Sequence, residues 1–139
     1  MINKEINTEK MPDGSSSFHP HARIVGDFVY VSGLIARQKD KQDIPGVVLG
    51  AAGKPVSQDV VAQFHAMMKN LTYILEEAGT NLEKVIDVTV FLTNIERDFK
   101  PFNTVYGEYF DKIKPCRTTV EVSKFPSPVS IEIKVIALK

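Results

Sequence analysis

The sequence predicts an α+β domain in which two helices pack on one face of a mixed β-sheet. Three observations predict this class: strand-like segments stand near both ends of the chain, a long central stretch repeats its apolar residues every three or four positions, and a second helical stretch follows one further strand. The expected order of elements is ββαβαββ, and 139 residues are enough for one domain of ordinary size.

The N-terminal third of the chain is expected to hold short strands and a loop. Residues 1–17 are mostly polar, so we expect an N-terminal arm, flexible or pinned, ahead of a single domain over residues 18–139. The stretch 24–34, IVGDFVYVSGL, is typical of two strands joined by a tight turn at its Gly-Asp pair. Residues 39–55 contain several glycines and prolines, which favours a loop with at most one brief strand.

The middle of the chain predicts an amphipathic helix between Ser57 and Ala78. Ser57 is the expected N-cap, and Gly79 is well placed to end the helix in a left-handed conformation. The apolar residues with helical spacing are Val60, Val61, Phe64, Met67, Met68, Leu71, Ile74 and Leu75.

The C-terminal half predicts three strands and a second helix. The run VIDVTVFL at 85–92 is typical of a buried strand, and a helix is expected over 99–110 with Pro101 in its first turn. Two strands, 117–122 and 131–138, follow on either side of a Pro-Ser-Pro turn.

Charge and cysteine content exclude several classes of protein. Seventeen Lys and Arg residues balance seventeen Asp and Glu residues, so we expect no nucleic-acid partner. No apolar run is long enough for a signal peptide or a membrane span, and the lone Cys116 allows no internal disulfide; we therefore expect a cytoplasmic protein with no membrane partner.

Two charged residues in the last strands are candidates for chemistry. Glu132 alternates with Ile131 and Ile133, so its side chain projects from the face opposite the apolar stripe. If the last two strands pair, Arg117 and Glu132 lie on the same wall. From the pattern alone, such a pair is also compatible with a surface ion pair worth at most about 1 kcal/mol.

The segment 115–120, PCRTTV, followed by IEI at 131–133, resembles the signature of the RidA (YjgF) family. The similarity extends to VYVSG at 29–33, EEAG at 76–79, the strand at 85–92 and the segment around Asn103 and Tyr106. Membership implies a chorismate-mutase-like fold and a homotrimer with active sites between subunits. It also implies hydrolysis of enamines and imines to carbonyl compounds and ammonia, with no metal or organic cofactor.

The resemblance assigns roles to Arg117 and Glu132. A guanidinium binds a planar carboxylate through two parallel hydrogen bonds and keeps its charge, so Arg117 is expected to anchor the carboxylate of a 2-imino or 2-enamino acid. A carboxyl group can steer water onto the imine carbon and deliver a proton to carbon or nitrogen, which is the role expected for Glu132.

Further positions correspond to substrate-binding residues of the family. Asn103 matches an asparagine that helps to hold ligand in the cleft, and Phe99 matches an aromatic residue that lines the cleft. Ser32 and Gly33 match a segment that helps to position substrate or water. Two positions depart from the common pattern. Thr119 replaces a small residue or cysteine but can still donate a hydroxyl hydrogen bond, and His19 stands where many relatives have tyrosine.

Within the family, the sequence looks closest to the 2-aminomuconate deaminase branch, whose substrate is a dicarboxylic enamine. The loop IPGV at 44–47 and the segment VYGEYF at 105–110 contribute to this similarity. A second carboxylate would need a second contact, from His19, Arg23 or Arg37. Two alternatives stay open: a general deaminase of small 2-imino acids of the 2-aminoacrylate type, and a non-catalytic binding or regulatory member of the family, including one that acts on RNA or as a chaperone.

The histidines and the cysteine do not predict a metal site or a nucleophile. His19 and His21 flank a proline, and the remaining histidine, His65, lies in the first predicted helix without ligand spacing. We expect His65 at a surface or an interface. Cys116 has no identifiable base beside it in the sequence, so we expect a structural or incidental thiol.

Overall fold

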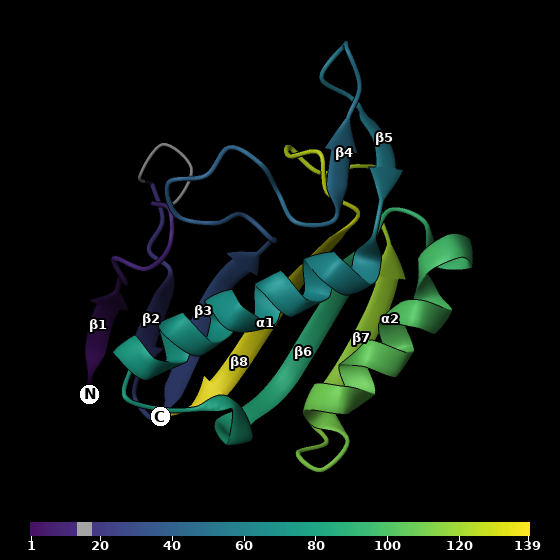
Figure 1. Cartoon of the computed structure of the whole chain (residues 1–139). Helices are drawn as coiled ribbons and strands as arrows, with labels where there is room; N and C mark the ends of the chain where they lie inside the picture. Colours follow the sequence, from purple (N-terminus) through teal and green to yellow (C-terminus); the bar gives the residue numbers. More distant parts are fainter. Residues whose placement is uncertain (14–17) are drawn as a thin grey trace.

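The computed structural model describes residues 1–13 and 18–139 (Figure 1). One sheet has six strands, a separate hairpin has two, and both helices cover the same face of the larger sheet. The elements are β1 (Asn3–Ile6), β2 (Ala22–Val25), β3 (Phe28–Leu34), β4 (Val47–Leu49), β5 (Pro55–Gln58), α1 (Val60–Glu77), the short 3-10 helix η2 (Leu82–Lys84), β6 (Val85–Leu92), α2 (Ile95–Phe110), β7 (Cys116–Glu121) and β8 (Ile131–Leu138). The α+β prediction is confirmed.

The order of strands in the large sheet is β1-β2-β3-β8-β6-β7. The last two strands, β7 and β8, do not pair with each other, because β6 lies between them. The chain passes from β6 through α2 to β7, and such a crossover connects parallel neighbours. Strand β8 then pairs antiparallel with both β6 and β3.

Helix α1 begins later than predicted. Its N-cap is Asp59, whose carboxylate accepts hydrogen bonds from the backbone N–H groups of Val61 and Ala62 at 3.0 and 3.1 Å. Ser57, the expected cap, belongs to β5 and pairs with Val48. The predicted end is confirmed, since Gly79 follows the helix with a left-handed φ of 79°.

Helix α2 also differs at its start. It begins at Ile95 after the N-cap Asn94, whose side chain accepts the N–H of Arg97 at 2.9 Å, so Pro101 lies inside the helix and not in its first turn. Proline removes one N–H donor, which would otherwise bond to the carbonyl four residues earlier. Pro101 is exposed on the surface of the helix.

The loop over 39–55 contains more regular structure than expected. It forms β4 and leads into β5, and together these strands make a hairpin that projects from the body (Figure 1). The N-terminal arm is pinned over Asn3–Ile6, because β1 pairs with β2; its residues 14–17 lie outside the described residues. No described helix combines the length and apolar character needed to cross a membrane.

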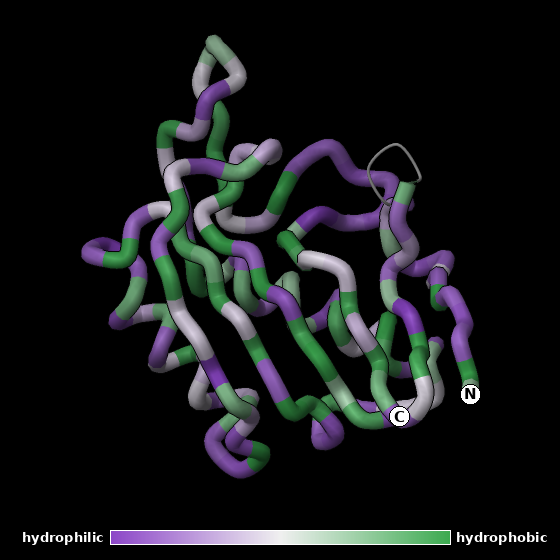
Figure 2. Tube along the Cα trace, turned by 180° about the vertical axis from the view of Figure 1, so that it is seen from behind, coloured by the Kyte–Doolittle hydropathy of each residue, from purple (hydrophilic) through white to green (hydrophobic). Residues whose placement is uncertain are grey.

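The face of the sheet opposite the helices stays open in this chain (Figure 2). Phe28, Tyr30, Val120 and Leu138 are each about two-fifths exposed, and Phe28, Tyr30 and Leu138 alternate with core residues of their strands. Val129, just before β8, is by contrast buried at 4% exposure. An apolar sheet face of this kind is typical of a surface that another protein chain covers.

Candidate functional site

Arg117 lies on β7 against the aromatic side chains of α2. Its guanidinium carbon is 4.7 Å from the ring centre of Tyr106 and 5.8 Å from those of Phe99 and Phe102. Its Nη1 also donates to Oδ1 of Asn103 at 2.8 Å. Cation–π contacts and one hydrogen bond thus orient the guanidinium while leaving most of its N–H donors available.

Two hydroxyl groups in the same region have no partner. Oγ1 of Thr119 and the phenol oxygen of Tyr106 are buried without a hydrogen bond to any described residue. Burial raises the pKa of Tyr106 above its usual value, although the Arg117 charge opposes that shift, so the phenol keeps its proton at neutral pH. Buried hydroxyls without partners are rare, and those beside a guanidinium are candidate donors to an anion.

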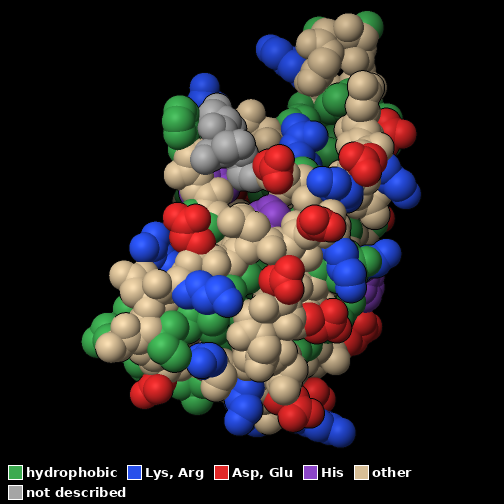
Figure 3. Space-filling model, turned by 90° about the vertical axis from the view of Figure 1, so that its left-hand side faces the viewer, with side chains coloured by type: hydrophobic (Ala, Val, Ile, Leu, Met, Phe, Trp, Pro, Cys, Tyr) green, Lys and Arg blue, Asp and Glu red, His purple; other side chains and the backbone are tan. Residues whose placement is uncertain are grey.

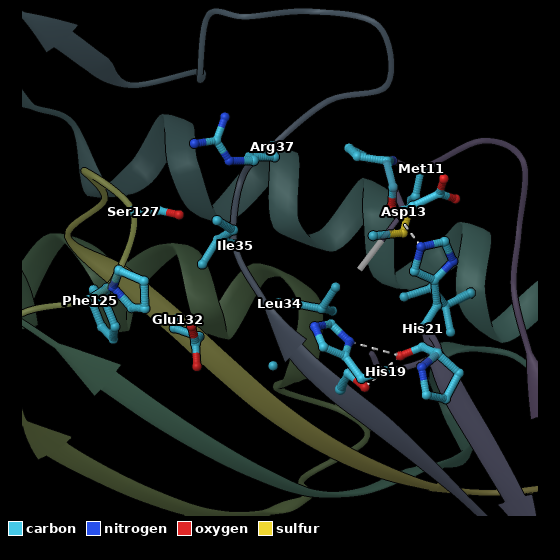
Figure 4. A pocket seen from close by; sticks show the side chains of 16 residues that line it. Met11, Asp13, His19, His21, Leu34, Ile35, Arg37, Phe125, Ser127 and Glu132 are labelled. Atoms are coloured by element: carbon cyan, nitrogen blue, oxygen red, sulfur yellow. Dashed lines mark hydrogen bonds between the residues drawn. The ribbon is translucent and has the colours of Figure 1, made fainter. Parts of the chain in front are cut away.

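Glu132 lies on β8 and lines a cavity of about 480 Å³ (Figure 4). The cavity is formed by the end of β3, the segment before β2, and the loop between β7 and β8. Of the predicted substrate-binding residues, His19, Ser32 and Gly33 also line it. Burial raises the pKa of Glu132 above its ordinary value, which brings its titration closer to neutral pH.

The Glu132 carboxylate packs directly against the backbone of Gly33. A Cβ atom at position 33 would lie only 2.7 Å from Oε2 of Glu132, closer than two such atoms can approach. The register of β3 against β8 shifts between Val31 and Leu34, and Nζ of Lys134 donates to the Val31 carbonyl at 2.6 Å. This bulge, held by Lys134, carries the glycine past the carboxylate.

Ser32 and His19 line the cavity that contains Glu132, and both contact the carbonyl of Pro20. The Ser32 hydroxyl donates to the carbonyl of Pro20 at 2.6 Å, so its oxygen lone pairs remain available to accept a hydrogen bond. Nδ1 of His19 lies 3.3 Å from the same carbonyl, which can only accept.

The predicted site residues therefore form two clusters. We call Arg117, Asn103, Phe99 and Thr119 the arginine cluster, and Glu132, Ser32, Gly33 and His19 the glutamate cluster. Strand β6 separates them, because Arg117 pairs with Val88 and Glu132 pairs with Phe91. Paired residues share a face of a sheet, and positions an odd number apart on one strand do not.

The two clusters lie on opposite faces of the sheet. Val88 is fully buried under the helices, so Arg117 lies on the helix-covered face, whereas Glu132 alternates with the fully buried Ile131 and Ile133 and lies on the open face. The condition under which both residues could share one wall, pairing of the last two strands, is not met. The cause is the intervening strand β6, which the sequence pattern does not reveal.

The three candidates for a second carboxylate contact occupy different places. Arg37 and His19 line the Glu132 cavity. Arg23 lies elsewhere, on the exposed part of β2, where it donates to Asn3 at 2.8 Å and lies 3.7 Å from Glu5. On the face of the molecule that corresponds to the left-hand side of Figure 1, Lys and Arg side chains are interspersed with Asp and Glu side chains (Figure 3).

The other histidines and the cysteine have identifiable surroundings. Nε2 of His21 donates to Pro12 at 2.7 Å, and its Nδ1 accepts from the N–H of Thr8 at 3.1 Å, which ties the N-terminal segment to β2. His65 is exposed and lies 2.6 Å from the Tyr109 hydroxyl. Cys116 is exposed. Within residues 1–13 and 18–139, no three His, Cys, Asp or Glu side chains are arranged to hold a metal ion.

Two contributors to the site were not predicted as such. Tyr106 packs beneath Arg117, and its helical spacing from Phe99 and Asn103, seven and three residues earlier, places all three on one stripe of α2. Lys134 follows Glu132 by two residues on β8 and therefore shares its face. Both spacings can be read from the sequence, but neither shows which residues Tyr106 or Lys134 contacts in the folded chain.

Comparison with known proteins identifies relatives of the whole domain. The family model described as endoribonuclease L-PSP matches residues 8–139. A RutC family protein of Pyrococcus abyssi is 37% identical over 100% of this chain and 99% of its own length. A crystal structure of a conserved Rid family protein from Yersinia pestis superimposes with a TM-score of 0.82. The two chains are 31% identical, and the match covers 99% of this chain and 100% of that one.

A further relative has a name that states an activity. Reactive Intermediate Deaminase A of Arabidopsis thaliana, a chloroplastic protein, is 30% identical over 98% of this chain and 66% of its own length. Since that relative resides in an organelle, the cytoplasmic location expected for the present chain stays a prediction.

Proposed function

The chain belongs to the RidA family, and on that premise we propose that it is a deaminase. It hydrolyses 2-enamino and 2-imino acids to carbonyl compounds and ammonia. The observation that carries the proposal is the placement of Glu132. Its half-buried carboxylate lies against Gly33 in a cavity that also contains Ser32 and His19. A carboxyl with a raised pKa beside hydrogen-bonding groups is suited to general acid–base chemistry.

In the proposed reaction Glu132 moves protons and water supplies oxygen. Protonation of the enamine carbon by the Glu132 carboxylic acid converts the C=C–N unit to an iminium. The carboxylate then takes a proton from water as its oxygen forms a bond to the iminium carbon. Glu132 passes that proton to the nitrogen of the carbinolamine. As the C–N bond breaks, the carboxylate takes the proton of the carbinolamine hydroxyl, whose oxygen becomes the carbonyl oxygen. One water is consumed and one ammonia is released for each carbonyl formed, and the carboxylic acid of Glu132 is restored.

Arg117 binds the substrate carboxylate in this proposal. Asn103 and the aromatic rings of α2 hold its guanidinium, while its remaining donors match the two oxygens of a carboxylate. The unpartnered hydroxyl of Thr119 can donate to the same group. Phe99 supplies an apolar surface beside the planar substrate.

Because one chain carries the two clusters on opposite faces, we propose that a complete site forms between chains, in a homotrimer. The open sheet face with its exposed Phe28, Tyr30 and Val120 supports burial against a neighbouring copy. In that arrangement the arginine cluster of one copy meets the glutamate cluster of the next. Static light scattering on the purified protein measures the molar mass; a monomer or dimer would contradict this part of the proposal.

For the substrate we propose 2-aminomuconate, which would yield 4-oxalocrotonate. The support is the sequence similarity to that branch together with a second cationic side chain, Arg37, on the Glu132 cavity. A general deaminase of small 2-imino acids is the alternative within the same chemistry. The charges lining the cavity are mixed, with Asp13 and Glu132 as well as Arg37, which suits a small polar substrate better than a phosphate backbone.

The test is ammonia release from freshly generated 2-aminomuconate and from 2-aminoacrylate-derived imines, each corrected for spontaneous hydrolysis. The proposal predicts acceleration that Arg117→Ala reduces at least about a hundredfold, because a charge-assisted bidentate contact is lost. Preference for 2-aminomuconate supports the catabolic role, and comparable rates favour the general deaminase. Absence of any Arg117-dependent rate on either substrate would contradict deaminase function.

A further inference from the structure

Arg37 occupies a part of the Glu132 cavity that the proposed chemistry does not use. Its side chain lies near Ser127 at one end of the cavity, whereas Asp13 lies beside Met11 at the other end (Figure 4). Among the described residues, no hydrogen bond or ion pair engages the Arg37 guanidinium. An arginine with five uncommitted donors on the wall of a substrate cavity is a potential anion contact.

The backbone that carries Arg37 is held firmly. Asn70 of α1 is buried at 4% exposure, and its side-chain amide donates to the carbonyls of Ile35 and Arg37 at 3.2 and 2.8 Å. Ala36, between them, is fully buried. Both contacts keep the segment after β3 in place, so Ile35 and Arg37 line the cavity while the residue between them packs into the core.

The opposite wall at this end is held as well. The Pro128 carbonyl accepts a hydrogen bond from Gln58 of β5 at 3.2 Å, and the N–H of Val129 donates to the Ser127 carbonyl at 2.9 Å. These contacts fix the loop that presents the Ser127 hydroxyl near the Arg37 end. A guanidinium and a hydroxyl on two anchored segments together offer several donors to one carboxylate.

We propose that Arg37, assisted by Ser127, forms a subsite for a second carboxylate, and that this subsite selects dicarboxylic over monocarboxylic substrates. The inference rests on the proposed function, in which Arg117 holds the carboxylate next to the reacting carbon. The distal carboxylate then extends from the Glu132 region toward Arg37, past the apolar side chain of Ile35. A monocarboxylic substrate leaves this subsite empty and gains nothing from it.

The test is calorimetric binding of two stable 2-oxo acids, 2-oxoadipate with two carboxylates and 2-oxobutanoate with one. The ratio of their dissociation constants is measured for the wild-type protein, for Arg37→Gln and for the control Arg23→Gln. Arg23 is also an exposed arginine, but it lies outside the cavity. We expect Arg37→Gln to weaken 2-oxoadipate binding roughly tenfold to a hundredfold and to leave 2-oxobutanoate unchanged. Arg23→Gln is expected to change neither.

An unchanged ratio in Arg37→Gln, or equal weakening of both ligands, would overturn the subsite. This readout does not depend on turnover. A wild-type protein that binds both acids but hydrolyses no enamine would overturn the proposed function, and the ratio would still decide the role of Arg37. Conversely, normal deamination with an unchanged ratio would overturn the subsite alone.

Discussion

Arg117 and Glu132 of one chain lie on opposite faces of the sheet, separated by strand β6. Arg117 pairs with Val88 and stacks on the rings of α2, whereas Glu132 pairs with Phe91 on the face without helices. Each residue nevertheless has the surroundings its proposed role requires: an oriented guanidinium in one place and a half-buried carboxyl in a cavity in the other. A site that needs both residues must therefore draw them from two copies.

Gly33→Ala should reduce activity more than stability. The added Cβ would lie 2.7 Å from Oε2 of Glu132, and because that atom ends a flexible side chain, the carboxylate moves rather than the backbone. We expect a fall of about tenfold to a hundredfold in kcat/KM, since misplacing a catalytic group by about an ångström has this effect. Steady-state kinetics and thermal unfolding measure the two quantities.

Gly107→Ala is the matched control for that variant. Gly107 lies within α2, and a Cβ there would meet nothing within 4 Å. Alanine is favoured over glycine inside a helix by about 0.5–1 kcal/mol, so this variant should unfold at a higher temperature with unchanged activity. Equal losses of activity in both glycine variants would contradict the proposed contact between Gly33 and Glu132.

Glu132→Gln should stabilise the fold in a pH-dependent manner. Burial raises the folded-state pKa of Glu132 above 4.5, so the ionised form is disfavoured in the folded protein. Below the unfolded pKa both states are protonated and the substitution has little effect; as pH rises through the folded pKa, the wild type loses stability that the variant retains. Denaturant titrations at several pH values measure the difference.

That comparison is best made with Arg117→Ala present in both proteins, so that no guanidinium of a neighbouring copy stabilises the carboxylate. The glutamine protein should gain stability between acidic and neutral pH, by less than about 1 kcal/mol because the carboxyl is only half-buried. A stability difference that does not vary with pH would contradict a raised pKa for Glu132.

Thr119→Val should separate binding from folding. The Thr119 hydroxyl is buried without a partner, so its replacement by a methyl group removes a desolvation cost and should stabilise the protein by about 1 kcal/mol. If the hydroxyl donates to the substrate carboxylate, KM should rise by about tenfold. A stabilised variant with unchanged KM and kcat would show that Thr119 has no part in substrate binding.

Local features of the fold could be predicted from the sequence. The periodicity of Val60 to Leu75 and the glycine after it are properties of one continuous segment, and α1 matches both. The start of α1 was predicted two residues too early, because serine is as good a cap as aspartate and only the pairing of β5 shows that Ser57 is extended. The order of strands depends on contacts between distant segments, which no local pattern contains.

In the candidate site, too, local motifs could be predicted from the sequence and contacts between distant segments could not. The residues around Arg117 and Glu132 carry motifs that can be read along the chain, and four of the eight predicted site residues line one cavity. Which face each residue occupies depends on the register of β6 against two neighbours. The anchoring of Arg37 by Asn70 joins positions 33 residues apart and leaves no trace in either local sequence.

The most direct test of the central claim is complementation between two inactive variants. Arg117→Ala and Glu132→Gln are each inactive alone in this account; the two proteins are unfolded, mixed in equal amounts and refolded together, and ammonia release is measured. In a closed trimer whose sites each draw Arg117 from one copy and Glu132 from the next, random assembly restores about one quarter of the wild-type sites. Recovery near that level is the predicted result. If the mixture remains as inactive as its components although each refolds to a trimer, Arg117 and Glu132 do not act together across copies, and the account is contradicted.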